Sequence, residues 1–247
     1  MSSAKNHYSY RVYADPQTAQ TFDQQRFGSA IGEFIKQTQE RIVFATLPDV
    51  TDWKVIDVGA GTGRFTFAFL ERGAEVTACD ASQEMLKVLQ SKIATGRKVE
   101  TKTIDAQDLT FADRSFHCSV SFRLLMHVMD WQKALSEICR VSRDWVVFDF
   151  PAKRGFLRLT PFFHFLRKPF ASNLQPYKVL SLQDIEEVLR RNNYTIVSRD
   201  DGYFLPIVIH RILHSPAFSR AAENAFAKLR LTSLFGSPVT IFARRTG

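Results

Sequence analysis

The chain has 247 residues, of which 45% are hydrophobic and 23% are charged, and its formal net charge is +8. This composition is typical of a compact globular protein and excludes disordered, collagen-like and disulfide-scaffold classes. The sequence shows no signal-peptide pattern and no apolar run of membrane-spanning length, so we expect a cytoplasmic protein.

The first 50 residues lie outside the pattern that governs the rest of the chain. After a tyrosine-rich lead, residues 17–47 show the spacing of one or two helices. We interpret residues 1–50 as a helical lid, in which Tyr8, Tyr13 and Arg26 close over a ligand. Ordinary helix packing explains the same three residues equally well.

From Lys54 onward, short apolar runs alternate with segments of helical period, which is typical of a parallel sheet covered on both faces. The predicted strands are residues 54–58, 75–79, 99–104, 116–121, 145–150, 194–198 and 239–243. We therefore predict a single α/β domain with a doubly wound, Rossmann-like, seven-stranded, mostly parallel sheet. Its core is 51–151, and its last helix and strands lie in 181–201 and 238–247. Cys79, Cys118 and Cys139 show no CxxC spacing, which predicts buried thiols in a reducing compartment.

Two segments, 152–180 and 202–237, do not belong to this alternation, and we interpret both as insertions that cap the substrate side. The first holds six bases and no acids, and the second holds four bases and one acid, so together they carry +9. The spacing of apolar residues in the second segment also predicts one amphipathic helix around Phe218 to Leu229. The bases include Arg154, Arg158, Arg167, Lys168, Arg211, Arg220 and Arg230.

A glycine-rich turn directly after the first strand is the strongest motif. Gly59, Gly61 and Gly63 stand at every second position, where they allow a tight turn and a close approach of the backbone to a ligand. A dinucleotide fingerprint would need its third glycine at Arg64. Asp57 just ahead of the loop favours a cationic ligand over a pyrophosphate.

Two more acids follow the next two strands. Asp80 stands where a carboxylate can accept hydrogen bonds from both hydroxyls of a ribose, and Asp105 where it can take an adenine amino group. In a doubly wound sheet the ends of three such strands line one crevice. The combination predicts a cationic amino acid joined to an adenosine.

The stretch 55–151 resembles the class I S-adenosylmethionine-dependent methyltransferases of the small-molecule type. The resemblance rests on motifs in matching order and spacing: Asp57 to Gly63, Cys79-Asp80-Ala81-Ser82 with Met85-Leu86, Asp105-Ala106-Gln107-Asp108-Leu109, Ser115-Phe116, Leu125-Met126-His127-Val128 and Glu137-Ile138-Cys139-Arg140-Val141. Two positions depart from the family's pattern. His117 stands where an acid is usual, and Ser142-Arg143-Asp144 replaces a Pro-Gly-Gly turn.

The resemblance implies S-adenosylmethionine as the cofactor. Asp57 and the three glycines would lie along its methionine part, Asp80 would hold the ribose, and Asp105 with Ala106 would read the adenine. Ala60, Ala81 and Arg26 complete the predicted cofactor-binding set.

Methyl transfer from a sulfonium needs alignment and exclusion of water more than a catalytic constellation. His127, after the fourth strand, is a candidate general base, although a structural histidine explains it as well. Arg123 and Asp149 also stand near strand ends, as surface charges or as groups that position the acceptor. The sequence contains no cluster at metal-ligand spacing, so we predict no metal.

The acceptor is left open by the sequence. The aromatic and basic caps favour a small or amphiphilic, lipid-like acceptor with an anionic group, and peripheral association with an acidic membrane. Alternatively, the phenylalanines only pack the caps and the bases only form the solvated face of the caps, with no role in binding an acceptor. The pI near 9.5 keeps an RNA-binding or RNA-modifying methyltransferase as an alternative. A nicotinamide-dependent oxidoreductase is the weaker alternative, because Arg64 stands where its fingerprint needs a glycine. The oligomeric state is not predicted.

Overall fold

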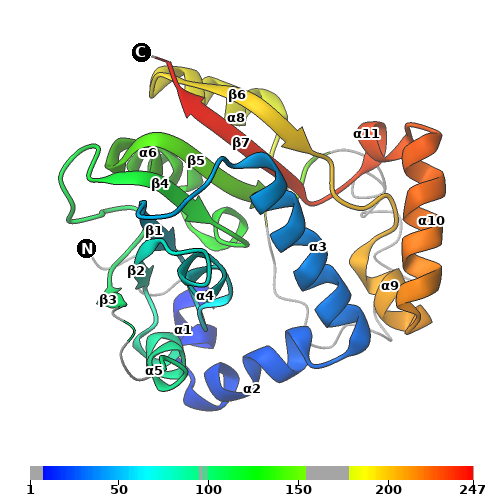
Figure 1. Ribbon diagram of the computed structural model, residues 1–247, viewed down its shortest axis with the longest axis horizontal. Coiled ribbons are helices and arrows are strands. Elements are labelled where there is room, and N and C mark those ends of the chain that lie inside the picture. The colour runs from blue at the N-terminus through cyan, green and yellow to red at the C-terminus, as the bar shows by residue number, and fades with distance from the viewer. Residues whose placement is uncertain (1–7, 95–96, 98, 154–177, 247) are drawn as a thin grey trace.

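The structure is a computed structural model that describes residues 8–94, 97, 99–153 and 178–246. Its centre is a seven-stranded sheet of order β3-β2-β1-β4-β5-β7-β6 (Figure 1). The first five strands are parallel, and β7 runs antiparallel between β5 and β6. The strands are β1 (Lys54–Val58), β2 (Glu75–Asp80), β3 (Glu100–Thr103), β4 (Phe116–Ser121), β5 (Ser142–Phe150), β6 (Tyr194–Asp200) and β7 (Val239–Arg245). The predicted Rossmann-like fold class is confirmed.

Helices lie on both faces of the sheet and at its carboxyl-end edge. In chain order they are α1 (Tyr8–Tyr13), α2 (Pro16–Phe27), α3 (Ala30–Thr46), α4 (Arg64–Leu70), α5 (Gln83–Ser91), the 3-10 turn η2 (Leu125–His127), α6 (Trp131–Val141), α8 (Leu182–Arg191), α9 (Ile207–Leu213), α10 (Pro216–Lys228) and α11 (Leu231–Phe235).

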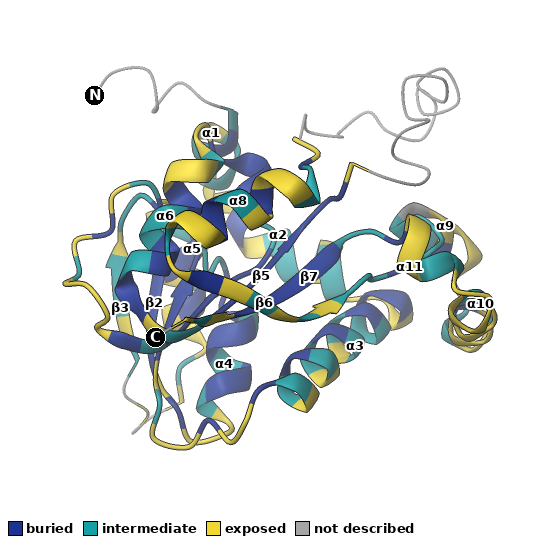
Figure 2. Ribbon diagram, turned by 90° about the horizontal axis from the view of Figure 1, so that it is seen from above, coloured by how far each residue is buried: buried dark blue, intermediate teal, exposed yellow. Residues whose placement is uncertain are grey.

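Alternate residues of the central strands enter two different cores, because successive side chains of a strand point to opposite faces. Val55 of β1 and Val147 of β5 pack with side chains of α3 and α4. Their neighbours Ile56 and Phe148 pack on the other face with α6 and α8. Figure 2 shows the largely buried strands between helices that each expose one side to solvent. The sheet is therefore anchored on both faces, which fixes the strand ends that carry the predicted site.

Strand β5 begins at Ser142, immediately after α6 ends at Val141. Ser142 pairs in parallel register with Phe116 of β4, so the Ser142-Arg143-Asp144 stretch belongs to the strand. This explains the missing Pro-Gly-Gly turn, because no loop separates helix from strand here. The three cysteines are free and buried, as predicted.

The amphipathic helix predicted around Phe218 to Leu229 is confirmed as α10, but 202–237 also forms α9 and α11, which were not predicted. The chain leaves α9 at His214, which has a left-handed φ of 50°. Ser215 then caps α10 through its hydroxyl, and Pro216 occupies the first turn, where a missing N–H costs nothing. Of the other cap segment, residues 154–177 lie outside the described residues, including Arg154, Arg158, Arg167 and Lys168. No helix in the described part of the chain is long and apolar enough to cross a membrane.

The N-terminal helices α2 and α3 link helices that lie on opposite sides of Figure 1. Helix α2 contacts α5, and α3 contacts α9 and α10 (Figure 1). The break between α2 and α3 falls at Gly28 and Ser29, and the Ser29 hydroxyl caps α3 by accepting from the Gly32 N–H. Two helices therefore occupy the region where one or two were predicted, with the short α1 ahead of them.

Candidate functional site

The glycine loop follows β1 and is fixed against the end of β2. Gly59, Gly61 and Gly63 have φ values of 75°, 56° and 94°, a left-handed region that side chains other than glycine rarely adopt. The N–H groups of Gly59 and Ala60 donate to the Cys79 carbonyl at 2.8 and 2.9 Å. The loop is therefore held in one conformation by its neighbour strand.

Only one of the three glycines faces open space. A Cβ on Gly59 would lie 2.9 Å from Leu124, and one on Gly63 would lie 2.7 Å from Phe67. A Cβ on Gly61 would meet nothing within 4 Å. The Gly61 backbone is thus the part of the loop that a ligand can approach without a side chain in the way.

Asp80, at the end of β2, is tied to the glycine loop. Its Oδ2 accepts from the Gly61 N–H at 2.8 Å and its Oδ1 from the Ser82 N–H at 2.8 Å. Burial raises the pKa of Asp80, and the N–H groups of Ser82, Gly61 and Ala81 counter that shift. Each carboxylate oxygen has further acceptor capacity, which suits two hydroxyls of a ligand.

Asp57 is a buried carboxylate in β1. It is 3% exposed, and its Oδ2 accepts from the Thr66 hydroxyl at 2.7 Å. Burial raises the pKa of Asp57 to about 6, against the lowering effect of Thr66 and Arg64. A cation beside it would favour the ionised form.

Asp105 follows β3 and is bonded by a side chain from α1. The Tyr10 hydroxyl donates to its Oδ2 at 2.6 Å, and the Gln107 N–H donates to its Oδ1 at 2.9 Å. Burial and the bond to Asp105 both raise the pKa of Tyr10. Ala106 beside it is buried in the core. Sequence reasoning did not single out Tyr10, and its only signal was the tyrosine-rich lead.

His127 ends η2 and is enclosed by α1. The Tyr8 hydroxyl lies 2.5 Å from its Nδ1, and the Ser9 hydroxyl donates to its carbonyl at 2.9 Å. The Tyr13 ring contacts the imidazole edge-on, 6.0 Å between centroids. These contacts give His127 a structural role, and its part as general base stays a prediction.

Arg26, on α2, lies at the β4 side of the crevice. Burial and the nearby charges of Arg123 and Arg211 lower its pKa to about 10, while Tyr13 raises it. Arg123 follows β4 with a φ of 59°, and its N–H donates to the buried Asp149 at the end of β5. Arg26 is thus grouped with arginines from other elements.

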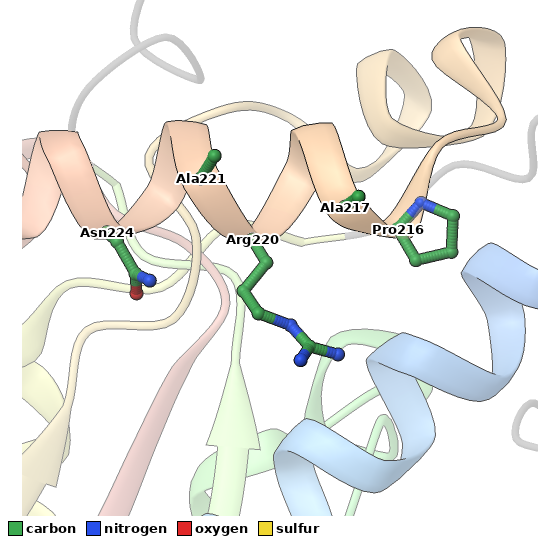
Figure 3. A pocket seen from close by; sticks show the side chains of 5 residues that line it. All are labelled: Pro216, Ala217, Arg220, Ala221 and Asn224. Carbon is green, nitrogen blue, oxygen red and sulfur yellow. The ribbon is translucent and has the colours of Figure 1, made fainter.

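The three carboxylates predicted from sequence end three neighbouring strands of the sheet, β1, β2 and β3 (Figure 1). Ligands of doubly wound sheets bind in the crevice outside such strand ends. A surface hollow lies elsewhere, on α10 (Figure 3), and is lined by Pro216, Ala217, Arg220, Ala221 and Asn224. None of these belongs to the predicted cofactor set.

Comparison with known proteins matches residues 56–146 to the methyltransferase domain family. Demethylmenaquinone methyltransferase of Clavibacter sepedonicus is 39% identical over 91 residues, which are 36% of this chain and 37% of that protein. An uncharacterized methyltransferase of Mycobacterium tuberculosis is 32% identical over 126 residues, 47% of each chain. The chain thus matches less than half the length of these curated relatives.

Solved structures share the whole fold at low identity. Magnesium protoporphyrin IX methyltransferase of Synechocystis PCC 6803, with bound SAH, is 18% identical with a TM-score of 0.61, covering 98% of this chain and 96% of that one. A possible histamine N-methyltransferase of Thermotoga maritima is 15% identical with a TM-score of 0.61, covering 93% and 98%. Residues 56–146 thus match the methyltransferase domain family, and the chain shares its fold with solved S-adenosylmethionine-dependent methyltransferases.

Proposed function

We propose that this protein transfers a methyl group from S-adenosylmethionine to a small or amphiphilic acceptor. The observation that carries the proposal is the placement of Asp57, Asp80 and Asp105 at the carboxyl ends of three adjacent strands, with Asp80 bonded to the open backbone of Gly61. These acidic groups suit a ligand that carries a sulfonium and an ammonium, and they would repel a ligand that carries a phosphate.

Each part of the crevice fits one part of that cofactor. Asp80 is bonded by backbone N–H groups and keeps acceptor capacity for two ribose hydroxyls. Asp57 would favour the cationic methionine part, with Gly59, Ala60, Gly61 and Gly63 along it, and Ala81 would border the ribose. Asp105 and Ala106 would border the adenine. When bound, the cofactor supplies an activated methyl group.

The protein's own task is to align the acceptor and exclude water. Helix α1 carries the residues that close the edge: Tyr8 at His127, Tyr10 at Asp105 and the Tyr13 carbonyl, which accepts from the Ser82 hydroxyl at 2.5 Å. A general base is needed only for an acceptor that arrives protonated. His127 is our candidate for it, with Tyr8 on its Nδ1.

A quinol-like or other amphiphilic ring compound is the acceptor class that we propose. The support is indirect: relatives of the matched domain are demethylmenaquinone methyltransferases, and a structure of the same fold is a magnesium protoporphyrin IX methyltransferase. Incubation with S-adenosylmethionine and a panel of hydroquinones and aromatic acids tests this, with mass spectrometry as the readout. An added methyl group on one panel member supports the proposal, and methylation of RNA alone contradicts it.

Peripheral binding to an anionic membrane is the second part of this proposal. Helices α9 to α11 and their connections hold seven of the ten exposed large hydrophobic side chains of the described residues: Ile209, Ile212, Leu213, Phe218, Leu229, Leu234 and Phe235. The same segment, 202–237, carries a net +3. Exposed apolar groups among bases are typical of helices that lie on acidic bilayers.

Vesicle flotation tests this part. Ile212 is 54% and Leu213 is 44% exposed on α9, so the double substitution to serine removes apolar area without opening a core. We expect it to reduce binding to phosphatidylglycerol vesicles, and added salt to weaken wild-type binding. Val197→Ser is the control, since Val197 is 52% exposed on β6. Equal binding by all variants, or no binding by the wild type, contradicts membrane association.

A further inference from the structure

Three arginines from distant parts of the sequence gather at the β4 side of the crevice. Arg26 comes from α2, Arg123 follows β4, and Arg211 lies on α9. The Arg211 guanidinium donates to the Arg26 carbonyl at 3.3 Å. All three side chains are partly buried. We call these three residues the arginine cluster.

The carboxylates near the arginine cluster do not balance its charge. Every aspartate and glutamate of the chain lies in the part that the structure describes, and none of them forms a salt bridge with the three guanidinium groups. Asp149 accepts the backbone N–H of Arg123; burial raises the pKa of Asp149 and the charge of Arg123 lowers it, but Asp149 also acts electrostatically on Arg64. One buried carboxylate is thus shared between Arg123 and Arg64, and neither Arg26 nor Arg211 forms a salt bridge, so positive charge exceeds negative charge at the cluster.

The charges of the arginine cluster oppose one another. Burial and the proximity of Arg123 lower the pKa of Arg211, and burial with both other arginines lowers that of Arg26 to about 10. Partly buried like charges raise the free energy of the folded state. An anion among them would relieve that repulsion, and guanidinium groups bind oxyanions through paired N–H donors.

The cofactor of the proposed reaction does not supply the needed charge. S-adenosylmethionine carries one carboxylate against an ammonium and a sulfonium, so as a whole it is a cation. Its charge matches the carboxylates at the ends of β1, β2 and β3. The crevice is thus acidic at the ends of β1, β2 and β3, and its basic side lies beyond the end of β4, which Arg123 follows.

We propose that Arg26, Arg123 and Arg211 together bind a carboxylate or similar oxyanion carried by the methyl acceptor. This inference rests on the proposed methyltransferase function and narrows its acceptor to molecules with a negative group. It also assigns Arg26 to the acceptor site instead of the cofactor site, because the charged groups beside it are Arg123 and Arg211 and not the three carboxylates.

Calorimetry with two matched probes tests the proposal. The protein is first saturated with S-adenosylhomocysteine, so that the cofactor crevice is filled, and is then titrated with octanoate or with the neutral octanamide. We expect octanoate to bind at least tenfold more tightly than octanamide, since hydrogen bonds between guanidinium and a carboxylate are stronger than those to a neutral amide. Equal affinities for the two probes would overturn the proposal.

Substitutions then locate the site. Arg123→Gln and Arg211→Gln should each weaken octanoate binding about 10- to 100-fold and leave S-adenosylhomocysteine affinity unchanged. Arg123→Lys should restore part of the loss, which separates charge from folding. Arg190→Gln, on the exposed side of α8, is the control and should change neither affinity.

Two outcomes separate the possible failures. If the glutamine variants lose affinity for S-adenosylhomocysteine but not for octanoate, the arginine cluster serves the cofactor's carboxylate and the acceptor proposal is wrong. If the wild type binds no S-adenosylhomocysteine at all, the proposed function itself fails. Octanoate binding that survives both substitutions also overturns the assignment.

Discussion

The Tyr10 hydroxyl donates a 2.6 Å hydrogen bond to Asp105, which lies 95 residues away in the sequence. This bond ties α1 to the end of β3, at the point where the adenine is expected. Together with the contacts of Tyr8 and Ser9 to His127, it fastens a six-residue helix that is too short to be stable alone.

We expect Tyr10→Phe to loosen α1 without affecting the core. The hydroxyl bond to a carboxylate contributes about 1.5 to 3 kcal/mol, so amide exchange in residues 8–13 should accelerate about tenfold or more. Hydrogen exchange followed by mass spectrometry measures this, with α8 as the internal reference. Unchanged exchange in α1 would show that the bond does not hold the helix.

Cofactor affinity should depend on pH through Asp57. Burial raises the pKa of Asp57 to about 6, so the carboxylate is protonated below that pH and ionised above it. A cationic ligand prefers the ionised form, and affinity for S-adenosylmethionine should therefore rise as pH increases through about 6. Calorimetry between pH 5 and pH 8 measures the midpoint of this dependence.

Thr66→Val sharpens this test, because the hydroxyl of Thr66 stabilises the ionised Asp57. Its loss should move the midpoint to higher pH, and Asp57→Asn should abolish the dependence. A profile that is the same in all three proteins would mean that Asp57 does not contact the cofactor.

Gly61→Ala should weaken cofactor binding more than it weakens the fold. The left-handed φ of 56° makes alanine strained by about 1 to 2 kcal/mol, yet the new Cβ meets no protein atom. Gly73→Ala is a matched control with a φ of 79° and an ordinary 3.4 Å contact to Thr51. Both variants should lose similar stability, and only Gly61→Ala should lose affinity for S-adenosylhomocysteine. If Gly61→Ala binds S-adenosylhomocysteine as tightly as Gly73→Ala does, the glycine loop is only a turn and does not contact the cofactor.

Asp80→Asn should lower cofactor affinity about 10- to 100-fold, since two ribose hydroxyls would lose a charged acceptor. One oxygen of Asp80 also holds the Gly61 N–H, and an amide nitrogen there would face that donor. Circular dichroism checks that the variant is folded. Full affinity in a folded Asp80→Asn protein is incompatible with the ribose assignment.

The strands were predictable from sequence because buried side chains mark them directly. Runs such as residues 54–58 carry apolar residues toward both cores and need no long-range information. The edge strand β3 was predicted too long, since its Glu100–Thr103 stretch is polar and the apolar Val99 and Ile104 lie outside it. The glycine loop and the acids that follow strands were readable for the same local reason.

Contacts between distant segments were not predictable. Neither Tyr10 at Asp105 nor the gathering of Arg26, Arg123 and Arg211 leaves a local pattern, because each depends on how α1, α2 and α9 meet the sheet edge. In 202–237, α10 was predicted, but α9 and α11 were missed because they have only seven and five residues. Periodicity needs a longer helix to be seen.

The most direct test of the central claim is a calorimetric titration of the wild-type protein with S-adenosylhomocysteine, alongside an identical titration with NAD. The placement of Asp57, Asp80 and Asp105 at three adjacent strand ends, with Asp80 bonded to Gly61, predicts one binding site per chain for S-adenosylhomocysteine and no heat of binding for NAD. Binding of NAD, or no binding of S-adenosylhomocysteine by the folded protein, would contradict the account.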